Sequence, residues 1–323
     1  IVELIEGDAE RVLVTFVFRC NSPTQAVAMR SSILGFGFPR LARLGTTDLC
    51  FRSSVAPRGV RDEYLFLPDP PPGDIYDLSP DQRQALKWTA DPLNSLSFQC
   101  GPLNERTSVL ELLGAEPQPW HAPWEGVPQG TVEPHRFDSE ILGGPRVVWT
   151  YIPAGYSPDS APYALAVFFD GYNYLHMGAQ HTLDNLIHAR RIPPMVCSFV
   201  QPADRTLELT CDETFAKAMA HDLVRVWLPE RVRVTDDPAR RVICGLSFGG
   251  LGAMFAGLRY PEVFGNVISQ SGSFWWGPGS RLPPDVSDSS IQWEWLTHQA
   301  GKAVTPTLRC FVEVGALEMS PPG

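Results

Sequence analysis

The sequence predicts a two-domain protein in which a smaller all-β domain of the sandwich type precedes a larger α/β domain. Its 323 residues exceed the usual size of one compact core. The first 70 or so residues consist of short β-type runs separated by turn residues. From residue 146 onward, continuous apolar runs alternate with helical patterns, which is typical of an α/β fold.

In the first domain, the clearest predicted strands are VLVTFVFR at 12–19 and YLFLP at 64–68. The stretch SPDQRQALKW at 79–88 is the first with a helical pattern. DPLN at 91–94 and EPQPWHAPWEGVP at 116–128 are predicted to be irregular connections, because proline removes a hydrogen-bond donor and fixes φ. We therefore expect one domain with its linker over 1–115 and a second domain over 116–323.

In the second domain, strands and helices are predicted to alternate along the chain. The predicted strands are RVVWTYIP (146–153), ALAVFFDG (164–171), MVCSFVQ (195–201), RRVICGLS (240–247), NVISQSGS (266–273) and TLRCFVEVG (307–315). The predicted helices are TLDNLIHARRI (182–192), FAKAMAHDLVRVWLPERV (215–232) and GLGAMFAGLRYP (250–261). Since the strands are continuously apolar, they predict a parallel sheet covered on both faces.

Charge and cysteine content exclude several classes of function. The net charge is -10 with 26 Lys and Arg against 36 Asp and Glu, which argues against nucleic acid as a partner. Since no apolar run approaches the roughly 18 residues of a membrane span, we predict no membrane anchor. The seven cysteines show no CxxC spacing, which indicates that they are buried free thiols and that the protein is cytoplasmic. The alternative is a secreted enzyme with up to three disulfides.

The motif Gly245-Leu246-Ser247-Phe248-Gly249 is the strongest chemical signal in the sequence. A bare G-x-S-x-G pattern is weak, but here a buried strand precedes the serine and a helix of small and apolar residues follows it. This context predicts a nucleophile elbow, in which the Ser247 hydroxyl projects from a strained turn, and hence an α/β-hydrolase domain. The alternative interpretation is a glycine-rich turn that serves only close packing.

A serine nucleophile needs a histidine base, and the base needs a carboxylate to orient it. The only histidine after Ser247 is His298, which lies in a helix-like stretch before the last strand and is expected to be a surface residue. We therefore expect the base beyond Gly323. Glu318 is the expected acid because it follows the last strand, whereas Glu313 within that strand is less suitable. The alternative for Glu318 is a solvated loop carboxylate.

The oxyanion needs two backbone N-H donors. We expect Phe248, directly after the nucleophile, to supply one, and Gly171 or Tyr172, in the turn after ALAVFFDG, to supply the other. The alternative is that Asp170-Gly171 is an ordinary turn. His181 and His188 share a helix face without a third ligand, and HExxH is absent, so we predict neither a metal site nor a cofactor.

SFGGLGAMFAGLRYPEVFGNVISQSGSFWW at 247–276 resembles the enterochelin esterase family, hydrolases that open the trilactone of ferric catecholate siderophores in the cytoplasm. The resemblance extends to FFDGYNY (168–174), RIPPMVCSFVQPADRTLELTCDETF (191–215), FVEVGALE (311–318) and DPLN (91–94). It implies Ser247 as nucleophile, Glu318 as the acid, and Arg205, Glu208, Trp275 and Trp276 near the substrate. The chain departs from the family in having no G-G-H segment, which there carries the base.

This resemblance is chemically reasonable. Catechol rings are flat and electron-rich, so Trp275 and Trp276 could stack on them, and the anionic iron complex would suit Arg205. The alternatives are core packing for the tryptophans and a surface ion pair for the arginine. The partner expected is therefore a small molecule. A general carboxylesterase or acyltransferase and a non-catalytic siderophore-binding protein remain alternative functions, and the sequence predicts no oligomeric state.

Overall fold

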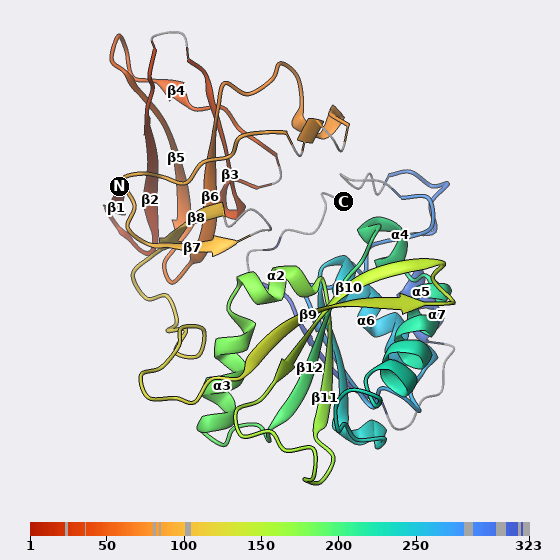
Figure 1. Cartoon of the computed structure of the whole chain (residues 1–323). Helices are drawn as coiled ribbons and strands as arrows, with labels where there is room; N and C mark the ends of the chain where they lie inside the picture. The colour runs from red at the N-terminus through yellow and green to blue at the C-terminus, as the bar shows by residue number, and fades with distance from the viewer. Residues whose placement is uncertain are drawn as a thin grey trace. The chain divides into compact units, whose positions relative to one another are not determined.

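The computed structural model describes residues 1–22, 25–35, 37–79, 82–83, 85–100, 105–280, 287–301, 308–315 and 318. Contacts within the chain divide it into two compact units, and the division falls between Gln118 and Pro119. The first unit consists mainly of β-strands, and the second has a central sheet with helices on both sides (Figure 1).

The first unit contains two four-stranded antiparallel sheets. One sheet has the order β1 (Val2–Ile5), β2 (Asp8–Arg19), β5 (Leu49–Pro57) and β4 (Ala42–Arg43), and the other has the order β3 (Val27–Ser31), β6 (Arg61–Pro68), β8 (Glu105–Glu111) and β7 (Ser97–Cys100). Two short 3₁₀ turns interrupt the strands: η1 (Ser32–Leu34) lies between β3 and β4 in the sequence, and η2 (Ile75–Asp77) lies between β6 and β7. The predicted strands 12–19 and 64–68 lie in β2 and β6.

The two sheets share one hydrophobic core. Val14 and Phe16 of β2 point into it by strand alternation, and Met29 of β3 and Phe66 of β6 meet them from the other sheet. The expected helix at 79–88 falls partly outside the described residues, and its end at 85–88 is not helical. Residues 82–83 are helical, and after the turn at residue 85 the chain reaches Thr89, which bridges to Phe66 on β6.

The second unit is built on a seven-stranded sheet of order β15-β14-β13-β11-β12-β10-β9. Strands β11 (Ala164–Phe169), β12 (Met195–Gln201), β13 (Arg241–Leu246), β14 (Asn266–Gln270) and β15 (Arg309–Glu313) are parallel, as predicted. The expectation of a parallel strand at 146–153 is wrong, because β10 (Gly144–Ile152) pairs antiparallel with both β9 (Thr131–Ser139) and β12. The short turn between β9 and β10 makes them a hairpin, which only antiparallel strands can form.

Helices cover both faces of this sheet (Figure 1). Alternate residues of β11 separate the two cores: Leu165 and Val167 face α5 (Glu213–Ala218), η3 (Met219–Trp227), α6 (Phe248–Arg259) and α7 (Trp295–Ala300), whereas Ala166 faces α2 (Gly171–His176) and α3 (Ala179–His188). Two shorter segments, α4 (Arg205–Leu209) and η4 (Pro238–Arg240), lie in the connections before α5 and β13. The prediction that both faces are covered is confirmed.

The helix expected at 215–232 forms two segments instead of one. After α5 the chain continues as the π-helical segment η3, with hydrogen bonds that span five residues, such as Leu228 N-H to the Leu223 carbonyl. Within η3, Asp222 accepts a hydrogen bond from the Ser139 hydroxyl at the end of β9. The regular period of the sequence gave no sign of this change of pitch.

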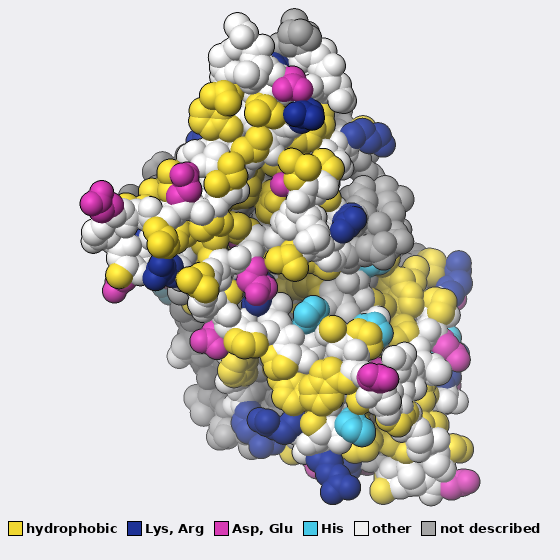
Figure 2. Space-filling view, turned by 90° about the vertical axis from the view of Figure 1, so that its left-hand side faces the viewer, with side chains coloured by type: hydrophobic (Ala, Val, Ile, Leu, Met, Phe, Trp, Pro, Cys, Tyr) yellow, Lys and Arg dark blue, Asp and Glu magenta, His cyan; other side chains and the backbone are white. Residues whose placement is uncertain are grey.

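The surface carries mixed charge on the face seen in Figure 2. There, acidic and basic side chains are interspersed among hydrophobic ones. Within the described part of the chain, no helix has both the length and the apolar character needed to cross a membrane.

Candidate active site

Ser247 lies where β13 ends and α6 begins, as the motif predicted. Its φ of 54° and ψ of -119° are unusual for a residue with a side chain, so the turn is strained. The turn is held on both sides: Ser247 N-H donates to the Gln270 carbonyl on β14, and Leu251 N-H donates to the Ser247 carbonyl. Ser247 is only partly buried and lies at the carboxyl end of β13.

The two glycines of the motif are required by close contacts. A Cβ on Gly245 would lie 2.1 Å from the Gly249 carbonyl oxygen, so the turn cannot close around a larger residue. A Cβ on Gly249 would lie 3.0 Å from Oδ2 of Asp170, at the end of the neighbouring strand β11. The pattern therefore reflects a tight turn packed against β11.

The expected oxyanion donors lie at the ends of two adjacent parallel strands. Phe248 is the first residue of α6 after β13, while Gly171 and Tyr172 begin α2 after β11. In both places the helix's own hydrogen bonds begin further on, at Leu251 in α6 and at Asn173 in α2. The carboxyl ends of β11 and β13 meet at one edge, because these two strands pair directly. The fold thus brings the three predicted donors to the same edge as Ser247.

Arg205, which begins α4, lies beside this edge. Its Nε and Nη2 each donate to one carboxylate oxygen of Asp170 at 2.8 Å, and its guanidinium carbon lies 5.5 Å from the centre of the Phe248 ring. Asp170 is only 1% exposed, whereas the Arg205 side chain is 37% exposed. The pair with Asp170 uses the Nε and Nη2 groups of Arg205.

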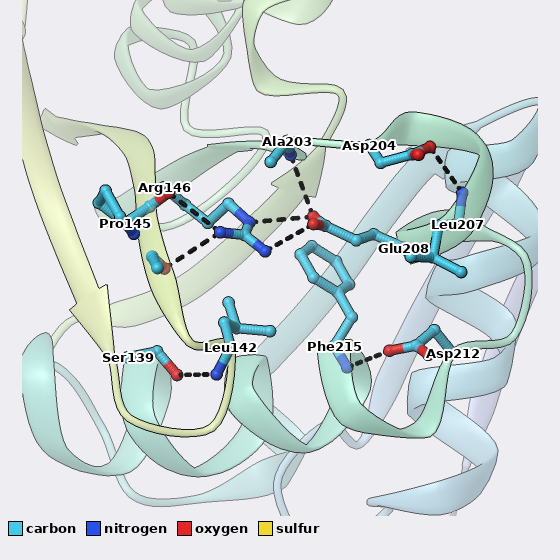
Figure 3. Close-up of polar contacts among 11 residues, drawn as sticks. Ser139, Leu142, Pro145, Arg146, Ala203, Asp204, Leu207, Glu208, Asp212 and Phe215 are labelled. Carbon is cyan, nitrogen blue, oxygen red and sulfur yellow. Dashed lines mark hydrogen bonds and ion pairs between the residues drawn. The ribbon is translucent and has the colours of Figure 1, made fainter.

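Glu208, three residues later, is engaged within the protein. Its two carboxylate oxygens accept from Nε and Nη2 of Arg146 on β10, at 3.1 and 2.6 Å, and one of them also accepts from the Ala203 N-H (Figure 3). Glu208 is 7% exposed and Arg146 is 10% exposed. The structure therefore places the Glu208 carboxylate in a buried ion pair, a position from which it supports α4 itself.

Of the two predicted tryptophans, Trp275 lies close to Phe248. The ring of Trp275 is 5.9 Å from that of Phe248, and Trp276 packs near Trp295 at 6.3 Å, with both partly buried. Sequence reasoning missed Trp293, whose ring lies 6.3 Å from Trp275 and extends this aromatic surface. Its one signal was the local density of tryptophan in the stretch 293–295.

Polar neighbours of Ser247 were also missed. The Ser273 hydroxyl lies 3.2 Å from that of Ser247. Gln270 links two side chains at the strand ends, accepting from the Tyr174 hydroxyl and donating to Glu313, both at 2.6 Å. Burial raises the pKa of Tyr174 well above its ordinary value. Burial likewise raises the pKa of Cys244 to about 12, so this nearby thiol is not a nucleophile.

The remaining predicted groups are the expected acid, His298 and the expected base. Glu318 is exposed, follows the end of β15 by five residues, and groups by its contacts with the first compact unit. His298 is an exposed residue of α7, as predicted. The histidine base expected beyond Gly323 lies outside the described residues. Among the residues that the structure does describe, no three His, Cys, Asp or Glu side chains are grouped to hold a metal ion.

Comparison with known proteins identifies close similarities. Residues 139–320 match the esterase family described as "Putative esterase". The chain is 34% identical over 264 residues to the iron(III) enterobactin esterase of Escherichia coli strain K12, an alignment covering 80% of this chain and 62% of that protein. It spans 61%, 62% and 58% of the length of three curated enterobactin esterases.

Two solved structures are similar over nearly the whole chain. The ferric enterobactin esterase from Salmonella typhimurium superposes with a TM-score of 0.76 at 30% identity, over 98% of this chain and 84% of that one. The enterobactin esterase from Shigella flexneri, crystallised in the presence of enterobactin, gives a TM-score of 0.73 at 28% identity, over 96% and 81% of the two chains.

Proposed function

Because the chain belongs to the enterobactin esterase family, we propose that the protein is a serine esterase that hydrolyses the trilactone ester bonds of a ferric catecholate siderophore. The observation that carries this proposal is the strained turn at Ser247, beside the first residues of α6 and α2. A serine in this backbone conformation between a strand and a helix is the arrangement used by esterases of the α/β-hydrolase fold.

In the proposed reaction, Ser247 Oγ attacks the carbonyl carbon of one ester bond. The carbonyl oxygen becomes an oxyanion and accepts hydrogen bonds from the N-H of Phe248 and that of Gly171 or Tyr172. The hydroxyl proton passes to a histidine base, which we expect outside the described residues and oriented by Glu318, and then to the departing alkoxide. Water hydrolyses the acyl-enzyme in a second step, and no cofactor takes part.

Substrate recognition would use the groups beside the nucleophile. The rings of Trp275 and Trp276 offer flat surfaces for catechol rings, and Arg205 offers Nη1 to an anionic iron complex. Opening the trilactone would weaken the hold on iron and so release it. We propose the cytoplasm as the site of this reaction, which is supported by the free thiols of the six cysteines whose side chains the structure describes.

Hydrolysis of a ferric trilactone tests this function directly. We expect the full-length protein to convert a ferric enterobactin-type trilactone to linear products, detected by chromatography and mass, with kcat/KM at least about tenfold above that for p-nitrophenyl acetate. The preference is expected because a simple ester cannot use the aromatic rings or the arginine. Equal turnover of both esters would instead indicate a general carboxylesterase, and binding without turnover would indicate a siderophore-binding protein.

Replacing Trp275 by leucine is expected to weaken substrate binding more than it slows the reaction. One aromatic pair contributes about 0.5–1.5 kcal/mol beyond its buried area, so we expect KM to rise about 2- to 13-fold with kcat little changed. The matched control is Trp120→Leu, since Trp120 stacks on Trp124 at 5.0 Å in the linker region. A lower kcat with unchanged KM would contradict a binding role for Trp275.

A further inference from the structure

Two ion pairs hold the short helix α4 at the edge of the active site. Arg205 in its first turn is paired with Asp170 after β11, and Glu208 in the same helix is paired with Arg146 on β10. Both pairs are bidentate, which fixes the direction as well as the distance of each contact. Asp204 caps the helix by accepting from Leu207 N-H (Figure 3). A helix of only five residues is thus fixed at both of its charged side chains.

Arg205 connects the two segments expected to donate hydrogen bonds to the oxyanion. On one side it binds Asp170, whose neighbour Gly171 is a predicted donor. On the other side its guanidinium lies against the ring of Phe248, the other predicted donor. Asp170 Oδ2 also lies close to Gly249 in the first turn of α6. Arg205 thus contacts both donor segments at the edge where β11 and β13 pair.

Glu208 sets the position of α4 from the opposite side. Its carboxylate binds both Arg146 and the Ala203 N-H, so it fixes the segment that leads into the helix as well as the helix itself. The next residue, Leu209, packs on α6, where a Cβ on Gly252 would lie 3.0 Å from the Leu209 carbonyl oxygen. Burying such an ion pair is often no more stabilising than apolar packing of the same volume, so its contribution is better explained by geometry than by stability.

We propose that Asp170, Arg205, Glu208 and Arg146 form a brace that fixes the spacing of the oxyanion donors, with Glu208 and Asp170 acting as positioning residues and not as substrate ligands. This inference rests on the proposed serine esterase function. Through the brace, the buried ion pair between Arg146 and Glu208 helps to stabilise the transition state. It does so because an oxyanion is stabilised best by hydrogen-bond donors that are held in place before the reaction.

The test uses Glu208→Gln, Asp170→Asn and Arg205→Lys in the full-length protein. Glu213→Gln is the matched control, because it removes one carboxylate charge from an exposed pair with Arg259 between α5 and α6. Three quantities are measured: kcat and KM for the ferric trilactone, the dissociation constant of the ferric catecholate from tryptophan fluorescence, and amide hydrogen exchange in peptides containing Gly171 and Phe248.

For Glu208→Gln and Asp170→Asn we expect kcat to fall about 10- to 100-fold, because small displacements of catalytic groups have effects of this size. The dissociation constant should change less than about threefold, and exchange should rise in both peptides. Arg205→Lys keeps the charge but not the bidentate geometry, so it should lower kcat similarly. The control should match the wild type. If Asp170→Asn does not fold, Glu208→Gln and Arg205→Lys decide the matter.

Two results would overturn the brace. One is a loss of affinity with kcat preserved in Glu208→Gln, which would make this carboxylate a substrate ligand. The other is unchanged hydrogen exchange at Gly171 and Phe248 in both charge variants. If the wild-type protein hydrolyses no ester, the proposed function fails, and the exchange measurements alone then confirm or reject the brace.

Discussion

Replacing Ser247 by alanine is expected to lower kcat for the ferric trilactone by about 10⁴-fold or more, because removing the nucleophile from a serine hydrolase removes the covalent route altogether. Binding should persist, since the hydroxyl contributes little to the ground-state complex. The full-length variant would be compared with the wild type in steady-state hydrolysis. Its ability to bind ferric catecholate would be followed by tryptophan fluorescence, and covalent labelling by a fluorophosphonate should disappear.

Ser273→Ala is the matched control for this experiment. It removes a hydroxyl 3.2 Å from that of Ser247 and leaves the nucleophile in place. We expect its kcat to stay within about tenfold of the wild type, since one neutral hydrogen bond contributes about 0.5–1.5 kcal/mol. Undiminished turnover by Ser247→Ala would end the proposed mechanism, whereas loss of activity in both variants would point to a collapse of the local structure.

Local pattern was sufficient to predict most of the second domain. The predicted strand at 195–201 coincides with β12, because a short apolar run bounded by turn residues is typical of a buried strand. The elbow was predictable for a similar reason: Gly245 and Gly249 lie where a side chain would collide with backbone or with Asp170. A position that accepts only glycine can therefore be recognised in the sequence.

Strand direction was not predictable in the same way. β10 is antiparallel to β12, yet its run VVWTYI reads like the parallel strands beside it. A strand covered on both faces is apolar whichever way it points, so periodicity carries no information on direction. Only the pairing of Gly144–Ile152 with Thr131–Ser139 decides it, and that pairing is a tertiary property.

The polar partners in the site were missed because they are distant in sequence. Arg146 and Glu208 are 62 residues apart, and Tyr174 and Gln270 are 96 apart. Neither pair has a spacing that a local motif could reveal. The family resemblance indicated that Glu208 matters near the substrate, but it could not indicate that its carboxylate faces Arg146. The structure supplies the contact from which its positioning role is inferred.

Gly171→Ala is expected to have the second large effect, on both stability and activity. A Cβ at this position would lie 2.4 Å from the Phe199 carbonyl carbon and 2.5 Å from the Val200 nitrogen. These are backbone atoms of β12, in the centre of the sheet, so they cannot move aside cheaply. We expect the free energy of unfolding to fall by about 3 kcal/mol, the upper end for overpacking a core.

The same methyl group would displace the start of α2 from the sheet edge and with it a predicted oxyanion donor. Loss of one such donor typically lowers kcat about 10²- to 10³-fold, and we expect a change of this size at unaltered KM. Gly144→Ala is the control, because a Cβ there meets only Nη1 of Arg146, at 3.9 Å. Thermal unfolding and steady-state kinetics of the folded fraction measure the two effects. A Gly171→Ala protein with wild-type Tm would show that α2 does not approach β12 this closely, whereas a lowered Tm with wild-type kcat would show that neither Gly171 nor Tyr172 is the second donor.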